Sequence, residues 1–150
     1  MSGGGAMRIE PAPATPRQRW RALLVDDDPW MLRIMRASLS SFARVVTCLS
    51  AEEALIALDR EPFDVVCTDL VMPGMNGVEL LRTVERTHRA TARLLVTGAE
   101  ERLPSEDRGR HAVLQKPFDP AHFAALVARL AGDAEGATEQ TKHAAHGGDR

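Results

Sequence analysis

The sequence of 150 residues contains no tyrosine, and phenylalanine and tryptophan together number only six. No apolar run approaches the ~18 residues that a membrane span needs, and "MSGGGAMRIE" lacks the apolar core of a signal peptide. The two cysteines, Cys48 and Cys67, both lie in apolar strand-like runs, so we expect them to be reduced core residues. These absences argue against membrane-spanning and secreted classes and predict a cytoplasmic protein.

The chain also lacks an excess of charge of one sign. Its net charge is −2 and its pI is near 6.2, which gives no general attraction to nucleic acid. Lysine is scarce, because only Lys116 and Lys142 stand among 19 basic residues and the rest are arginine. Of the two lysines, only Lys116 falls in a patterned region, so its ammonium group is a candidate functional cation.

The two ends of the chain differ in composition from its centre. Residues 1–19 contain three prolines and a run of three glycines without a periodic apolar pattern. Residues 132–150 are small, polar and rich in glycine. We therefore predict a disordered N-terminal lead over 1–19, one folded domain over 20–131 and a disordered tail over 132–150.

Within the central region, short apolar runs alternate with helical patterns. The predicted strands are residues 22–26, 44–49, 63–69, 93–98 and 111–115. Helices are expected between them, with the first over 29–40 and the last over 119–130. Their predicted caps are Asp28 with Pro29, Ser50 with Glu53, Asn76 with Glu79, and Asp119 with Pro120. This alternation predicts a doubly wound α/β domain, with a five-stranded parallel sheet and helices on both faces.

In such folds the working groups lie beyond the carboxyl ends of the strands. The first strand ends in Asp26 and Asp27, the third in Asp69 and the fourth in Thr97, and Lys116 follows the fifth. Clustered carboxylates repel one another unless a cation joins them, and oxygen ligands suit Mg²⁺. An ionised aspartate is a nucleophile without a general base, and a metal, a hydroxyl and an ammonium can neutralise a transferring phosphoryl group. The set therefore suits magnesium-assisted phosphoryl transfer to a carboxylate.

Four segments, "LLVDDDP", "DVVCTDLVMPGMNG", "LLVTGA" and "LQKPF", closely resemble the receiver domain of two-component response regulators over residues 21–131. The resemblance implies a flavodoxin-like fold with strand order 2-1-3-4-5. It implies a phosphorelay function, in which a sensor histidine kinase or a histidine phosphotransfer protein gives its phosphoryl group to this chain. The chain would promote its own phosphotransfer and autodephosphorylation without being an enzyme that acts on a separate substrate.

The same resemblance assigns a role to each residue of the site. Asp69 would be the phospho-acceptor, Thr97 and Lys116 would each contact a phosphoryl oxygen, and the peptide bond joining Lys116 to Pro117 would be cis. The expected Mg²⁺ ligands are Asp26, Asp27, Asp69 and the backbone carbonyl of Val71, whereas Asp28 falls outside the site and caps a helix. Phosphorylation would switch the binding of another protein, since no segment after residue 131 is long enough for an output domain.

Three features depart from the family pattern. Gly98 replaces the usual alanine after Thr97, Val113 replaces a switch aromatic, and the segment 98–110 is short and interrupted by Pro104. We expect the fourth helix to be short or irregular. Because its only apolar residues are Ala99 and Leu103, the segment should open easily and become ordered on phosphorylation.

Three other interpretations remain open at this point. A pseudo-receiver would bind partners without phosphorylation, and the chain could also be a fragment of a longer regulator or hybrid kinase. Asp26 and Asp28 after a strand resemble the nucleophile motif of haloacid-dehalogenase-like phosphatases. That third interpretation leaves Asp69, Thr97 and Lys116 unexplained and lacks the family's downstream acidic pair.

Overall fold

The computed structural model describes residues 19–147, with side-chain surroundings as far as Ala134. The predicted N-terminal lead, residues 1–19, lies outside the described residues except for Arg19. Its expected disorder therefore stays a prediction.

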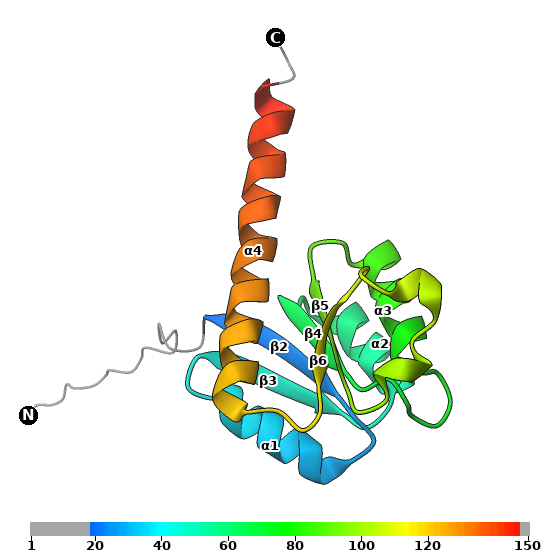
Figure 1. Cartoon of the computed structure of the whole chain (residues 1–150). Helices are drawn as coiled ribbons and strands as arrows, with labels where there is room; N and C mark the ends of the chain where they lie inside the picture. Colours follow the sequence, from blue (N-terminus) through cyan, green and yellow to red (C-terminus); the bar gives the residue numbers. More distant parts are fainter. Residues whose placement is uncertain (1–18, 148–150) are drawn as a thin grey trace, which may run out of the picture.

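Five strands form one parallel sheet, in the order β3-β2-β4-β5-β6 (Figure 1). They are β2 (Trp20–Val25), β3 (Ala43–Cys48), β4 (Val65–Thr68), β5 (Ala92–Thr97) and β6 (Ala112–Gln115). Taken in chain order this is 2-1-3-4-5, so the predicted flavodoxin-like fold is confirmed. Each predicted strand lies within two residues of an observed one.

The register of the sheet brings the ends of its strands together. Val25, the last residue of β2, pairs with Cys48 on one side and with Thr68 on the other. At the far side, Thr97 pairs with Gln115. Since these are the final residues of their strands, the residues that follow them share one edge of the sheet, where the candidate site was predicted.

Four α-helices cover the two faces: α1 (Pro29–Leu39), α2 (Ala51–Arg60), α3 (Gly77–Thr87) and α4 (Pro120–Gly147). Along β2, Leu23 and Val25 pack with α2 and α3, whereas Ala22 and Leu24 pack with α1 and α4. This alternation follows from the two-residue period of a strand. It produces two apolar cores, one on each face of the sheet, as a doubly wound domain requires.

The predicted caps are present at the starts of these helices, except that the predicted capping box at α2 is incomplete. The carboxylate of Asp28 accepts from the Trp30 backbone N–H, and Asn76 and Glu79 form a complete capping box. Ser50 caps α2 by accepting from the Glu53 N–H, but the Glu53 carboxylate accepts from the backbone N–H of Leu49 instead of closing the expected box. At α4 the Asp119 carboxylate accepts from the Ala121 N–H, as a capping side chain does.

The crossover between β5 and β6 contains two 3₁₀ turns, η2 (Glu100–Arg102) and η3 (Ser105–Asp107), in place of a regular fourth helix. This agrees with the prediction of a short or irregular helix. The segment is held more firmly than its composition indicated, because Leu103 is buried in the core and Asp107 is fully buried. The Asp107 carboxylate accepts from the Arg82 guanidinium on α3. The expectation of easy opening rested on apolar residues alone and left this ion pair out.

The C-terminal helix differs from the prediction. It begins at Pro120 as expected, with Phe123 and Val127 fully buried, but it continues past the predicted boundary at 132 and ends at Gly147, well beyond the sheet (Figure 1). The sequence of this extension contains several alanine, glutamate and glutamine residues, which favour a helix, and Gly132 and Gly136 are each unfavourable by only ~1 kcal/mol. The expected tail therefore continues α4.

Two further observations concern the predicted reduced cysteines and the predicted absence of a membrane span. Cys48 and Cys67 are both buried free thiols, and burial raises the pKa of Cys48 to about 11, with the nearby Glu53 carboxylate adding to the shift. Among the described residues, no helix combines the length and the apolar character needed to cross a membrane.

Candidate metal and phosphoryl-acceptor site

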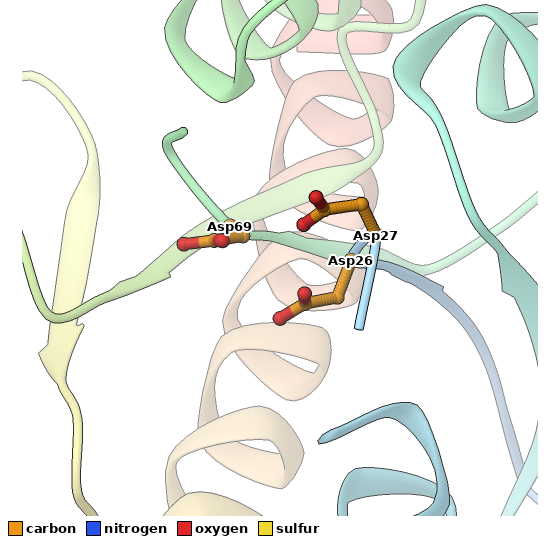
Figure 2. A group of neighbouring side chains, drawn as sticks. All are labelled: Asp26, Asp27 and Asp69. Atoms are coloured by element: carbon orange, nitrogen blue, oxygen red, sulfur yellow. The ribbon is translucent and has the colours of Figure 1, made fainter. Parts of the chain in front are cut away.

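Three carboxylates meet at the carboxyl edge of the sheet. Asp26 and Asp27 follow β2 and Asp69 follows β4, and one carboxylate oxygen of each lies within 4.8 Å of those of the other two. Figure 2 shows the three side chains pointing to the same side. Asp26 is buried, Asp27 is exposed and Asp69 is between these limits, so the cluster is closed on the protein side and open to solvent at Asp27.

The backbone of the parallel sheet fixes the acidic positions. The Asp26 N–H donates to the Cys48 carbonyl at 3.1 Å, and the Asp69 N–H donates to the Val25 carbonyl at 3.0 Å. These bonds continue the strand ladders by one residue beyond β2 and β4. Asp26 and Asp69 are therefore held as rigidly as the strands that precede them.

Lys116 provides the cation of the site. Its Nζ donates to Oδ2 of Asp26 at 2.9 Å and lies 3.6 Å from Oδ1 of Asp69. The Lys116 backbone N–H donates to the Thr97 carbonyl at 2.9 Å, and the peptide bond to Pro117 is cis, as predicted. One ammonium thus joins two of the three carboxylates and leaves the cluster with a net negative charge.

The surroundings of Asp69 disfavour its ionised form. Burial raises the pKa of the Asp69 carboxyl above its ordinary value, and the nearby Asp26 carboxylate raises it further. Lys116 and the Leu70 N–H, which donates to Oδ1 of Asp69 at 2.8 Å, oppose the shift. A divalent cation would favour ionisation of all three carboxylates, and hard oxygen ligands of this kind fit Mg²⁺.

The remaining predicted residues lie at the same edge with different contacts. Thr97 is buried, and its hydroxyl accepts from the Ala99 N–H at 3.0 Å. Val71, two residues beyond Asp69, has an exposed side chain. Asp28 lies outside the acidic cluster and caps α1. Because its carboxylate is engaged with the Trp30 N–H, Asp28 does not contribute the second carboxylate that a haloacid-dehalogenase-like site would need.

Two residues that support the site could not be identified from the sequence. A Cβ atom at Gly77 would lie 1.9 Å from the Asp69 backbone oxygen, so α3 can begin beside the acceptor only with glycine there. Glu52 on α2 accepts from the Met75 N–H at 3.0 Å and fixes the loop between β4 and α3. The proline and glycines of "PGMNG" are typical of a loop, but nothing in the sequence links Met75 to Glu52, which is 23 residues away.

The fold and the site together define a doubly wound α/β domain with an acidic cluster, bridged by a lysine, at the carboxyl edge of its sheet. The family model of the response regulator receiver domain matches residues 22–128. The chain belongs to the response regulator receiver domain family. Receiver domains of this family accept phosphoryl groups from histidine kinases.

Individual relatives agree with this assignment. The transcriptional activator protein PfeR of Pseudomonas aeruginosa is 37% identical over 73% of this chain, and the match covers 37% of PfeR. The virulence sensor protein BvgS of Bordetella bronchiseptica is 38% identical over 57% of this chain and 7% of its own length. The solved structure of the BeF3-activated DrrB receiver domain has a TM-score of 0.66 and 32% identity, covering 74% of this chain and 96% of that one. The chain thus spans a minor part of the two curated relatives and nearly all of the solved receiver.

Proposed function

We propose that Asp69 accepts a phosphoryl group from a phosphohistidine of a sensor histidine kinase or a histidine phosphotransfer protein. The observation that carries this proposal is the meeting of three carboxylates within 4.8 Å, with Lys116 bonded among them. Asp26, Asp27, Asp69 and the backbone carbonyl of Val71 would hold Mg²⁺. The bound ion would neutralise oxygens of the transferring phosphoryl group.

The residues of the chain have distinct parts in the transfer. A carboxylate oxygen of Asp69 attacks phosphorus while the bond to the donor imidazole breaks, so the phosphoryl group passes from nitrogen to oxygen. Lys116, now 3.6 Å from Asp69, contacts a phosphoryl oxygen and offsets its charge. The Thr97 hydroxyl accepts from the Ala99 N–H and still has its own proton to donate to another phosphoryl oxygen.

The phosphoryl group is then lost by autodephosphorylation, in which water attacks phosphorus and Asp69 is restored as a carboxylate. The protein is therefore a phospho-acceptor that promotes its own reaction, not an enzyme acting on a separate substrate. We place it in the cytoplasm, where phosphorylation of Asp69 switches its binding to an output protein. The proposed organisation is a receiver domain that begins at residue 20 and includes α4, which continues beyond residue 131, and the domain contacts no nucleic acid directly.

Phosphate-affinity electrophoresis tests the assignment of Asp69. Acetyl phosphate with Mg²⁺ should retard the wild-type protein, and EDTA should abolish the retardation. Asp69→Asn should show no retarded band, whereas Asp28→Asn should behave as the wild type because asparagine also caps helices. The Asp28→Asn control removes a carboxylate from the same aspartate run without altering the acidic cluster.

A retarded band that persists in Asp69→Asn would contradict the assignment. The absence of any retarded band in the folded wild type, with both acetyl phosphate and a phosphorylated kinase as donors, would favour the pseudo-receiver interpretation. Circular dichroism of the same samples establishes that each variant is folded.

A further inference from the structure

An arginine-rich groove lies at the other end of the strands, away from the acidic cluster. It has a volume of about 630 Å³ and is lined by Arg82, Glu85, Arg86, Arg89, Arg93 and Arg110. Arg93 is the second residue of β5 and Arg110 precedes β6, so the groove borders the amino ends of these strands. It lies beside a crossover that has two short 3₁₀ turns where a regular helix would provide a longer cover.

Two of these arginines already have carboxylate partners. Arg110 Nε donates to Glu85 at 2.9 Å, and Arg82 is bound to Asp107 and lies 3.6 Å from Glu106. These pairs neutralise part of the groove. Arg82 also joins the groove directly to the crossover, because its partner Asp107 belongs to η3.

The other three arginines carry uncompensated charge. In the part of the chain that the structure describes, no carboxylate forms an ion pair with Arg86, Arg89 or Arg93. The Arg93 Nε is buried without a hydrogen-bond partner, which costs free energy unless a ligand accepts from that group. The groove is therefore strongly positive although the whole chain has a net charge of −2.

A neighbouring side chain responds to this positive charge. His111 is buried beside Asp107, and burial lowers its pKa, with the Arg93 guanidinium lowering it further. The charge of Arg93 therefore acts within the protein and is not fully screened by solvent. An anionic ligand in the groove would offset the positive charge of Arg93.

The spacing of the arginines favours an extended ligand. Arg82 and Arg86 are four residues apart on one side of α3, and Arg89 lies two residues beyond the end of this helix, where it lines the same groove. Guanidinium groups bind carboxylates through paired hydrogen bonds, so a row of them matches a row of acidic side chains.

We propose that this groove binds an acidic segment of a partner protein, rich in aspartate or glutamate. A single phosphate would engage only some of these arginines, and none of the residues that line the groove is aromatic, so nucleic acid bases would find no ring to stack on. The inference goes beyond the phosphoryl-acceptor function, because the groove and Asp69 lie at opposite ends of the strands. Binding of the acidic segment needs no phosphoryl group on Asp69.

Fluorescence anisotropy with a labelled peptide of alternating glutamate and serine tests the proposal. The wild-type protein should bind it, with an affinity that falls as salt rises, and should not bind the peptide with glutamine in place of glutamate. Arg86→Gln and Arg89→Gln should each weaken binding about fivefold, the size of a solvent-exposed charge pair. Arg36→Gln, at an exposed arginine of α1 on the opposite face of the sheet, should bind as the wild type.

Three results would overturn the proposal: equal binding of the glutamate and glutamine peptides, wild-type binding by Arg86→Gln and Arg89→Gln, or tighter binding of inorganic triphosphate or single-stranded DNA than of the acidic peptide. Arg86 and Arg89 are exposed, so neither substitution should impair folding. Asp69→Asn should bind the peptide normally, which separates this test from that of the acceptor.

Discussion

Three adjacent aspartates, Asp26, Asp27 and Asp28, have different environments and different roles. Asp26 is buried and bonded to Lys116, Asp27 is exposed at the mouth of the cluster, and Asp28 caps α1. The end of β2 explains this separation, because consecutive side chains leave a strand in different directions and the chain then turns into a helix. Sequence position could predict this division because the strand end, Pro29 and the apolar pattern of α1 were all recognisable.

Gly77 shows what the sequence could not reveal at the residue scale. Whether position 77 can accept a side chain depends on the Asp69 backbone oxygen, because a Cβ atom would collide with it. The two residues are eight positions apart and are joined by a loop without regular structure. We expect Gly77→Ala to reduce the free energy of unfolding by about 3 kcal/mol, since a Cβ atom cannot fit 1.9 Å from that oxygen. Urea denaturation measures the change.

Gly132→Ala is the matched control for this prediction. It places the same methyl group in α4, where no atom lies within 4 Å of the added Cβ. Removing a helix-interior glycine should leave stability unchanged or increase it by up to ~1 kcal/mol. Equal stability of Gly77→Ala and Gly132→Ala would contradict the prediction, because it would mean that the loop before α3 adapts freely to the added methyl group.

At the scale of the elements, the strands and capped helices were predictable, whereas the crossover anchor and the end of α4 were not. The strands were recognisable as apolar runs, because the sheet buries both of its faces. The helix caps were recognisable from residues such as Asp28 and Asn76. The crossover anchor was missed because the Asp107–Arg82 pair joins positions 25 residues apart. The length of α4 was not predicted because the small, polar and glycine-rich composition of residues 132–150 indicated a flexible tail, although a helix tolerates isolated glycines.

The Asp107–Arg82 pair leads to a prediction about the crossover. In Asp107→Asn, amide hydrogens of residues 103–111 should exchange about tenfold faster than in the wild type, because a charge-assisted bond is lost from a buried group. Residues 98–102, which precede the anchor, should change little. Glu106→Gln, which alters only an exposed neighbour, should exchange as the wild type.

The effect of this pair also depends on pH. The Arg82 guanidinium holds the pKa of Asp107 below its ordinary value, so the unfolded chain binds a proton more readily than the folded one. The stabilisation is therefore present above the ordinary aspartate pKa of about 4 and is lost as pH falls through the lowered value. Equal acid dependence of unfolding in wild type and Asp107→Asn would contradict the role of the pair.

For the whole molecule, the acidic cluster links metal binding to folding. The unfolded chain does not hold Asp26, Asp27 and Asp69 together, so Mg²⁺ should bind the folded state. At 100 times its dissociation constant, Mg²⁺ should stabilise the domain by ~2.7 kcal/mol, measured as a rise in Tm. Asp27→Ala should lose most of this response, and an equal rise in variant and wild type would place the metal elsewhere.

The strand order and the acidic edge of the molecule could both be predicted from the sequence. A parallel sheet brings the carboxyl ends of its strands to one edge, whatever the details of side-chain packing. The arginine groove could not be predicted, because its residues come from α3, the turn after α3, β5 and the turn before β6, and they meet only in the folded protein. The acidic edge can therefore be recognised from sequence patterns, whereas the groove can be recognised only from the three-dimensional structure.

The central claim is that Asp69 carries the phosphoryl group, and chemical mapping tests it most directly. Borohydride reduces an aspartyl phosphate to homoserine, which tandem mass spectrometry places in the sequence. After phosphorylation with acetyl phosphate and Mg²⁺, we predict homoserine at position 69 and none when EDTA is present. Homoserine at position 26, 27 or 28, or none in the folded and magnesium-loaded protein, would contradict the claim.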